Sequence, residues 1–303
     1  MVNKNKYEKY TLLLGKGFAL NVYLPALKAI NCKMIALEKS SQKLINYDID
    51  NLEIKWVDKN DIINNKFHKI IIAEPPEVQF KYICEESLWK NTDNIILEKP
   101  LAADSKKAKY LVNILNKNKS NYSVNYTFRY TEWFKKINNY LHNNIHKEEI
   151  SINWKFKARH LQKKESSWKT NVQLGGGAVK YYGIHLIAIL SDIGYFEVNK
   201  NKITNSKSNK QITWSCEFNS TNKLPKLSLY LDSYSNEDEF YWHQKNQAIL
   251  ELDSPFSLES SKYNGDQRIP PTINFLKEKQ TDLMNVKNMN ALELWSKIES
   301  KTW

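Results

Sequence analysis

The chain has 303 residues, of which 41% are hydrophobic and 26% charged, and its formal net charge is +12. This length favours two domains, and the composition is that of a globular protein rather than a disordered or fibrous one. No apolar run approaches the roughly 18 residues that a membrane-spanning helix needs, and the N-terminus has no signal-peptide pattern, so we expect a cytoplasmic protein without a membrane partner.

The spacing of the cysteines argues against disulfides and a metal site, and the scattered distribution of the positive charge argues against a nucleic-acid partner. Cys32, Cys84 and Cys216 are far apart and odd in number, and no metal-ligand spacing occurs, so we expect neither a disulfide framework nor a metal site. Most of the excess lysine is scattered among asparagines, and no recognition motif accompanies it. We therefore expect no nucleic-acid partner. The one concentrated basic stretch covers residues 155–169.

Glycine is scarce and clustered. The chain has eight glycines, whereas an average chain of this length has roughly 20. Two of them are Gly15 and Gly17, and four lie between Gly175 and Gly183. Glycine permits backbone conformations and close approaches that a side chain forbids, so both clusters are predicted to be functional backbone sites.

Strands and helices alternate over the first part of the chain. Apolar runs predict strands at 10–14, 33–38, 52–57, 68–76, 93–100 and 123–128. Helical spacing between them predicts one helix after the first strand, one over 77–89 and one that begins at an N-cap residue, Asp104. This alternation is typical of βαβ units and a mostly parallel sheet, which makes the fold class α/β.

The pattern changes after about residue 125. A strand at 152–158 and an apolar helix over 178–190 are followed by strands at 211–218, 226–234, 239–244 and 247–252. Strands joined by short turns predict a mostly antiparallel sheet. Ala291, Leu294, Trp295 and Ile298 predict a final helix, and residues 200–210 are expected to form an exposed loop. We therefore place a second, α+β domain at residues 125–303.

The first glycine cluster lies where a dinucleotide is bound in many α/β proteins. Gly15-Lys-Gly17 follows a strand, and Phe18 and Ala19 open a helix. Gly15 permits the tight turn, Gly17 lets the backbone approach the pyrophosphate, and the helix start offers free N–H groups. Leu20 stands where glycine or alanine is usual. Residues 1–124 are therefore predicted to be a Rossmann NAD(P)-binding domain.

Residues at the ends of later strands bear on which cofactor is bound. Glu38 ends the second strand and can accept hydrogen bonds from both ribose hydroxyls, which favours NAD. Lys39, Ser40 and Ser41 follow it and could hold a 2′-phosphate, so NADP stays open. The Pro75-Pro76 loop follows a later strand and falls at the same edge of the sheet.

Three further motifs complete a resemblance. They are Glu98-Lys99-Pro100, Asn125-Tyr-Thr-Phe-Arg129 and the segment from Gly175 to His185. With the glycine turn they occur in the order and spacing of the Gfo/Idh/MocA oxidoreductases, which the chain resembles over residues 11–190. This family includes glucose–fructose oxidoreductase and inositol dehydrogenase. The resemblance implies a C-terminal domain with an open antiparallel sheet, a nicotinamide between the domains, and homo-oligomer contacts through that sheet.

The resemblance also implies catalytic residues. Lys99 would sit beside the nicotinamide, stabilise an alkoxide and relay a proton, and His185 would be the acid/base residue. Tyr181 stands where the family usually has aspartate, and Ala188 where it often has another acidic residue. Two explanations stay open: Tyr181 donates the proton or orients His185, or the protein binds cofactor or ligand without hydride transfer. Gln79, where the family often has histidine, is a further departure.

The substrate side is expected around the second glycine cluster. Cations together with an indole suit the diphosphate and ring of a nucleotide-linked sugar, although a solvated charged loop is the alternative. The predicted substrate-binding residues are Arg129, Lys157, Arg159, Trp168, Lys169, Gly176, Tyr182 and His185. The sequence thus predicts an NAD(P)-dependent sugar dehydrogenase or ketoreductase acting on CH–OH groups, most simply those of a nucleotide sugar.

Overall fold

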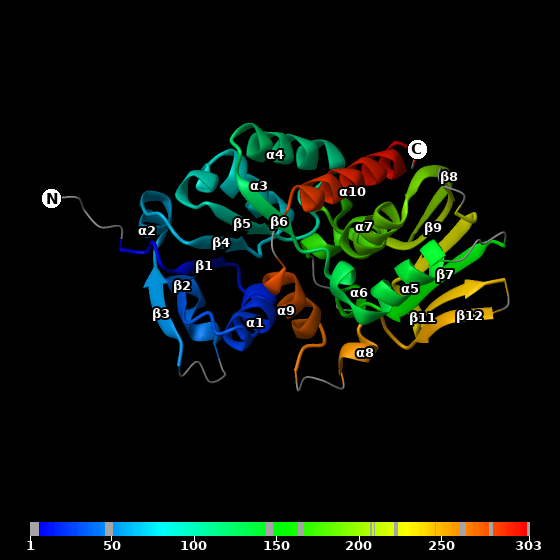
Figure 1. Cartoon of the computed structure of the whole chain (residues 1–303), viewed down its shortest axis with the longest axis horizontal. Coiled ribbons are helices and arrows are strands. Elements are labelled where there is room, and N and C mark those ends of the chain that lie inside the picture. Colours follow the sequence, from blue (N-terminus) through cyan, green and yellow to red (C-terminus); the bar gives the residue numbers. More distant parts are fainter. Residues whose placement is uncertain are drawn as a thin grey trace.

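Two six-stranded sheets, each covered by helices, make up the computed structural model (Figure 1). The structure describes residues 6–45, 51–143, 148–162, 167–206, 208, 210–220, 224–245, 247–260, 265–278 and 281–301. Within these residues, no helix combines the length and the apolar character needed to cross a bilayer.

The first sheet is parallel throughout, with the order β3-β2-β1-β4-β5-β6. Its strands are β1 (Thr11–Leu14), β2 (Met34–Glu38), β3 (Glu53–Val57), β4 (Lys69–Ile72), β5 (Asn94–Leu97) and β6 (Asn121–Val124). The strand order runs outward in both directions from β1, which creates a switch point between β1 and β4. Ligands of such sheets bind outside the carboxyl ends of the strands at this point.

Helices cover both faces of the first sheet, and this explains its continuous apolar strands. They are the helical segment η1–α1 (Ala19–Tyr23 and Leu24–Ala29), α2 (Lys59–Asn64), α3 (Pro76–Cys84) and α4 (Ser105–Lys117). All four residues of β1 are buried. The predicted cap of α4 is confirmed, since Asp104 Oδ1 accepts a hydrogen bond from the Lys107 backbone N–H at 2.8 Å.

The second sheet has the order β12-β11-β7-β10-β9-β8. Its strands are β7 (Ile150–Lys157), β8 (Tyr195–Asn205), β9 (Gln211–Ser220), β10 (Leu227–Asp232), β11 (Tyr234–Gln244) and β12 (Gln247–Leu252). The pairing of β7 with β10 is parallel, and the other pairings are antiparallel. The predicted fold class, a Rossmann-type domain followed by a mostly antiparallel sheet, is confirmed.

One predicted loop is wrong, and several α-helices were not predicted. Residues 200–210 were expected to be a loop, but β8 continues to Asn205 and pairs with β9. Strand β8 is an edge strand, and edge strands tolerate the charged and polar residues that suggested a loop. The α-helices that were not predicted are α2, α5 (Glu132–Asn143), α6 (Arg159–Gln162), α8 (Ser257–Ser260) and α9 (Ile269–Lys277).

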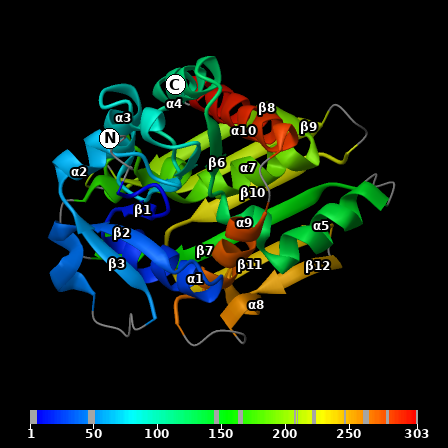
Figure 2. The same ribbon diagram turned by 60° about the vertical axis from the view of Figure 1, so that its left-hand side comes forward.

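The last helices of the chain return to the first sheet. Helix α9 packs against α1, and α10 (Asp282–Ser300) lies along α4 and along α7 (Ile184–Ile193), as Figures 1 and 2 show. Residues that are far apart in the sequence therefore meet at the carboxyl edge of the first sheet.

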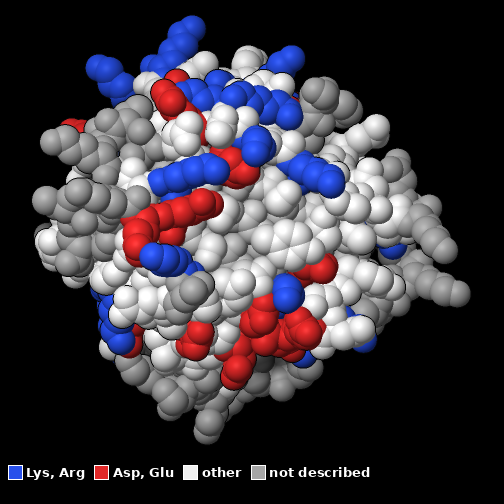
Figure 3. Space-filling view, turned by 90° about the vertical axis from the view of Figure 1, so that its right-hand side faces the viewer, with Lys and Arg blue, Asp and Glu red and all other residues white. Residues whose placement is uncertain are grey.

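The outer face of the second sheet is polar. Opposite charges pair on it, as in Lys155 with Glu239 at 3.0 Å and Lys200 with Glu217 at 3.2 Å. Figure 3 looks at this end of the molecule and shows acidic and basic side chains beside broad uncharged areas. Homo-oligomer formation through this sheet stays a prediction.

Candidate active site

The glycine turn after β1 touches the end of β4. Gly15 has a φ of +115°, and a Cβ atom on it would lie 2.3 Å from the carbonyl oxygen of Ala73. Only glycine fits this position. Gly17 has open space where a Cβ would be, with no atom within 4 Å. The turn thus leaves room beside Gly17, where the sequence predicted a pyrophosphate. Phe18 is half-buried, and Ala19 and Leu20 lie in the core.

The helix that follows this turn begins as a π-helix over Ala19–Tyr23. A second π-helix, η7 (Ala178–Gly183), follows the other glycine cluster. Single π-turns are rare and occur frequently at functional sites. A π-helix therefore follows each of the two glycine clusters.

The side chains at the end of β2 and just after it differ in burial and in their partners. Glu38 is half-buried, and burial raises the pKa of its carboxyl, against the opposing effect of Lys16. Lys39 Nζ pairs with Asp58 at 3.2 Å. Ser40 is exposed, whereas Ser41 is buried. The lysine that could hold a 2′-phosphate thus has a protein partner.

The Glu98-Lys99-Pro100 turn is held from three sides, and its Lys99–Pro100 peptide bond is cis. Glu98 is 7% exposed, and its carboxylate accepts hydrogen bonds from Tyr23 Oη at 2.8 Å and Asn125 Nδ2 at 3.0 Å. The side chain of Gln79 accepts from Glu98 N and donates to the carbonyl oxygens of Glu98 and Leu101, at 2.8, 2.9 and 3.0 Å. Gln79 thus positions the turn, a role that the sequence alone did not indicate.

Lys99 points from this turn to the second domain. Its Nζ donates a hydrogen bond to the carbonyl oxygen of Tyr181 at 2.9 Å and lies 4.4 Å from the centre of the Tyr181 ring. Burial lowers the pKa of Lys99 to about 7, Glu98 opposes this shift, and Arg268 and Lys169 add to it. An amine with this pKa can take up or release a proton near neutral pH.

Tyr181 lies within a group of aromatic and basic side chains. Its ring centre is 5.3 Å from that of Trp168, 5.4 Å from that of His160 and 4.7 Å from that of Tyr182. Lys169 Nζ is 5.6 Å from the Tyr181 ring centre. The Tyr182 hydroxyl lies 3.2 Å from His160 Nδ1. Five predicted site residues, namely Lys99, Trp168, Lys169, Tyr181 and Tyr182, are thus brought together.

His185 lies deeper than the lysine. It is 6% exposed and stacks on Phe128, with the ring centres 4.8 Å apart. Its Nδ1 is buried and has no hydrogen-bond partner among the described residues. Burial, followed by Lys99 and Arg268, lowers the pKa of His185 well below its usual value. The imidazole is therefore neutral at physiological pH and can exchange hydrogen bonds but not carry the proton as a cation.

The second glycine cluster packs against backbone and proline rings. A Cβ on Gly176 would lie 2.2 Å from the carbonyl oxygen of Trp168, and one on Gly175 would lie 2.9 Å from Pro76 Cγ. These glycines let the second domain approach the loops that follow β4 and β5. Their close approach is to protein, so the predicted substrate contact of Gly176 finds no support in this geometry.

Two predicted substrate residues are not brought to this group. Arg129 donates hydrogen bonds to Asp192 from Nε at 2.8 Å and from Nη2 at 3.0 Å, and both side chains are 4% exposed. Its Nη1 donates to Asn288 Oδ1 at 2.6 Å. Lys157 shares a face of β7 with Lys155 because side chains alternate along a strand, and Lys155 pairs with Glu237 and Glu239 on the outer face. The structure therefore does not bring Arg129 or Lys157 to the group around Tyr181.

The remaining basic residues of this region have different positions. Arg159 is exposed. Its charge lowers the pKa of Asp266, so Arg159 lies near the Asp266–Arg268 pair. Lys163 and Lys164 lie outside the described residues.

Arg268 is a site residue that sequence reasoning missed. It pairs with Asp266 at 2.5 Å, and its guanidinium carbon lies 4.9 Å from the centre of the Phe18 ring. An arginine from the second part of the chain therefore covers the glycine turn of the first. The sequence does not indicate this role, because Arg268 is a single arginine before Ile-Pro-Pro and belongs to no periodic pattern. Only the folded structure shows that it lies against Phe18.

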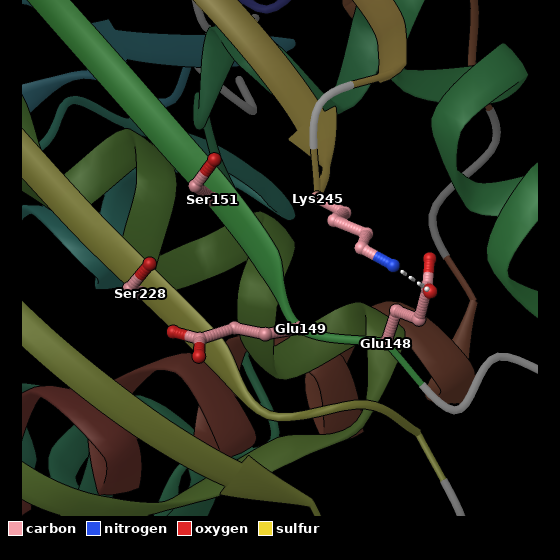
Figure 4. Close-up of a pocket in the computed structure, with 5 residues that line it drawn as sticks. All are labelled: Glu148, Glu149, Ser151, Ser228 and Lys245. Atoms are coloured by element: carbon pink, nitrogen blue, oxygen red, sulfur yellow. Dashed lines mark hydrogen bonds and ion pairs between the residues drawn. The ribbon is translucent and has the colours of Figure 1, made fainter.

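Two hollows lie away from these residues. One, of about 700 Å³, lies beside η7 between the start of α4 and the end of α10, and contains the Lys180–Glu299 pair at 3.1 Å. The other, of about 470 Å³, lies at the start of β7, where Glu148 pairs with Lys245 at 3.0 Å beside Ser151 and Ser228 (Figure 4). None of the predicted site residues lines either hollow.

The arrangement is a two-domain fold whose first domain is of the Rossmann type, and solved structures of other proteins have the same fold. No protein-family model matches the sequence, and no curated protein matches it. Solved structures do. The chain is 12% identical to the WlbA (WbpB) dehydrogenase of Thermus thermophilus, crystallised with NAD and UDP-GlcNAcA, with a TM-score of 0.68 over 97% of this chain and 94% of that one.

Two further neighbours show the range of proteins with this fold. KijD10, a 3-ketoreductase of Actinomadura kijaniata crystallised with NADP and TDP-benzene, is 12% identical, with a TM-score of 0.67 over 97% of each chain. A super-repressor mutant of Gal80p from Saccharomyces cerevisiae is 13% identical, with a TM-score of 0.76 over 97% of this chain and 95% of that one. The fold implied by the Gfo/Idh/MocA resemblance is therefore confirmed.

Proposed function

We propose that the protein is an NAD(P)-dependent oxidoreductase that moves a hydride between nicotinamide and a secondary alcohol or ketone carbon of a nucleotide-linked sugar. The observation that carries this proposal is the meeting of Lys99 and Tyr181. A lysine with a pKa of about 7 leaves the first domain at the carboxyl edge of its sheet and lies against a tyrosine of the second domain.

The residues at the strand ends fit a dinucleotide. Gly17 leaves open space beside the start of a helical segment, and the described protein offers no side chain that fills it. The proposed cofactor-binding residues are Gly15, Gly17, Phe18, Ala19, Glu38, Pro75, Pro76, Glu98, Lys99 and Asn125, and Arg268 joins them because it covers Phe18. The bound nicotinamide supplies the site for hydride gain and loss.

Lys99 holds the proton that the reaction exchanges. In the direction of oxidation, neutral Lys99 takes the proton of the substrate hydroxyl; in the direction of reduction, its ammonium group donates a proton to the forming alkoxide. The ring of Tyr181 faces the ammonium group and stabilises it through a cation–π contact. Neutral His185 would position the substrate oxygen by a hydrogen bond.

The nucleotide-linked sugar is proposed from the side chains around Tyr181. Trp168 and Tyr182 offer aromatic faces, and Lys169 offers a cation for a diphosphate. Arg159, which lies near Asp266, is proposed as a second cation. The WlbA and KijD10 structures, which contain UDP-GlcNAcA and TDP-benzene, support this substrate class.

The second candidate is a protein that binds the cofactor or a sugar nucleotide without turnover. Tyr181 covers Lys99, and the two positions beside His185 where the family has acidic residues are Tyr181 and Ala188. Gal80p, whose solved mutants are super-repressors, has the same fold.

Two measurements separate these candidates. Titration of NADH with the protein should enhance cofactor fluorescence. Absence of binding at millimolar cofactor would contradict the first candidate and would leave the second only as a protein that binds a sugar nucleotide. Absorbance at the NADH band should then change when NAD or NADH is mixed with UDP- and dTDP-linked sugars and their keto forms. Binding without any absorbance change across this panel supports the second candidate.

A further inference from the structure

A second carboxylate lies at the end of the cofactor site expected to hold the adenosine ribose. Glu38 ends β2, and Glu74 follows β4, which ends at Ile72. Strands β2 and β4 are the two neighbours of β1 in the sheet. Since the carboxyl ends of parallel strands meet at one edge, Glu38 and Glu74 flank the glycine turn from its two sides.

Neither carboxylate has a partner in the protein. Glu38 and Glu74 are both half-buried, and neither forms a hydrogen bond or an ion pair with any residue that the structure describes. Lys39, the neighbouring cation, pairs with Asp58 instead. Both carboxylates are therefore free to accept hydrogen bonds from a ligand. A ligand that covers them must offer hydrogen-bond donors, and the hydroxyl groups of a ribose are such donors.

The charged and titratable groups that face Glu74 come from three elements. Glu38 approaches from β2, Lys16 from the glycine turn and Tyr82 from α3. Burial and Glu38 raise the pKa of Glu74 to about 7, and Lys16 opposes this shift. Because β2 and β4 lie on either side of β1, their carboxyl ends place Glu38 and Glu74 at the same edge of the sheet, where the charge of one carboxylate disfavours the charge of the other.

We infer that Glu74 acts with Glu38 to select NAD(H) against NADP(H): the two carboxylates accept hydrogen bonds from the 2′- and 3′-hydroxyls of the adenosine ribose and repel a 2′-phosphate. This inference rests on the proposed function, because it concerns the cofactor of that site. It assigns a specificity role to Glu74, which follows β4, in addition to the acidic residue at the end of β2.

The selection should depend on pH. Below pH 7 Glu74 is protonated, and only Glu38 repels a 2′-phosphate. Above pH 7 Glu74 is ionised, and the repulsion comes from two charges. The preference for NADH over NADPH therefore grows as the pH rises through 7. Lys16 faces both carboxylates and partly offsets their repulsion of a 2′-phosphate.

The test is a fluorescence titration of NADH and NADPH at pH 6 and pH 8. It compares the wild type with Glu74→Gln and with a control, Glu77→Gln, whose carboxylate lies on α3 and pairs with Lys107 at 2.7 Å. At pH 8 the wild type should bind NADH about 100-fold more tightly than NADPH. Glu74→Gln should reduce this ratio about tenfold at pH 8 and change it little at pH 6.

The outcomes separate the inference from the proposed function. The 2′-phosphate has its own ionisation near pH 6, but this affects all three proteins equally. If the wild type binds neither NADH nor NADPH, the proposed function fails. If both bind and Glu74→Gln leaves the ratio at pH 8 unchanged, or if NADPH binds more tightly, the inference is overturned and cofactor binding stands. A reduced ratio in Glu74→Gln with an unchanged one in Glu77→Gln supports the inference.

Discussion

The two ends of the proposed cofactor site each contain one group with a pKa of about 7, and they reach it from opposite directions. At the nicotinamide end, burial lowers the pKa of Lys99. At the ribose end, burial raises the pKa of Glu74. Desolvation disfavours the charged form of both, so the same physical cause moves an amine down and a carboxyl up.

The neighbours of the two groups differ, and this difference indicates what each end does. Glu98 opposes the shift of Lys99, and Lys99 has a hydrogen-bond acceptor in Tyr181. The charge next to Glu74 is of the same sign, and no protein donor contacts its carboxylate in the described structure. The nicotinamide end is therefore arranged to hold a proton, and the ribose end to accept hydrogen bonds from a ligand.

Removing Lys99 should have the largest effect on turnover. Lys99→Met leaves no group at this position that can exchange a proton, so kcat should fall about a thousandfold. NADH affinity should stay within a few-fold of the wild type. Steady-state kinetics and NADH fluorescence measure the two quantities, and Lys117→Met, on the exposed end of α4, is the matched control. A variant with more than a tenth of wild-type kcat would remove Lys99 from the mechanism.

Arg129 contrasts with Lys99 and Glu74, because its charge is fully paired inside the protein. Arg129→Met should leave Asp192 buried without its partner and lower the free energy of unfolding by about 3–5 kcal/mol. Urea denaturation measures this loss. NADH affinity at a temperature where the variant is folded should not change. An unaltered stability combined with loss of sugar binding would restore the substrate role predicted from the sequence.

The pH dependence of the rate tests the state of Lys99. Oxidation needs the neutral amine, so its rate should fall about tenfold per pH unit below 7; reduction needs the ammonium group, so its rate should fall in the same way above 7. The two limiting slopes are read from kcat/KM between pH 5.5 and 9. Two profiles with no inflection between pH 6 and 8 would show that the group that titrates is not Lys99.

Tyr181→Phe should have the smallest effect. The substitution keeps the ring that faces Lys99, and so keeps the cation–π contact, but removes the hydroxyl. We expect kcat to fall about tenfold if the hydroxyl takes part in proton transfer. Tyr182→Phe, which removes the hydroxyl near His160, is the neighbouring control. Full activity in Tyr181→Phe would exclude the hydroxyl from proton transfer and leave the tyrosine only the cation–π contact of its ring with Lys99.

The sequence predicted those parts of the site that lie at strand ends. Glu38 ends an apolar strand, Gly15 and Lys99 each follow one, and the parallel sheet brings the ends of such strands together. Side-chain pairing across the fold could not be predicted in this way. Arg129 meets Asp192 and Asn288 only after α7 and α10 are packed, and Arg268 reaches Phe18 only because α9 returns to the first sheet.

Two other features could not be predicted from the sequence: the polar edge strand, and the face of a strand to which a given side chain points. The residues of β8 have the composition of a loop, and only pairing with β9 makes them a strand. Lys157 was grouped with other cations of its segment, although alternation along β7 turns it to the outer face of the sheet.

A crystal structure with bound NADH would test the central claim most directly. We predict that nicotinamide C4 faces the space beside Lys99 Nζ and Tyr181, with the pyrophosphate at Gly17 and the adenosine ribose between Glu38 and Glu74. A nicotinamide ring that lies away from Lys99, or a cofactor that binds elsewhere on the molecule, would contradict this account.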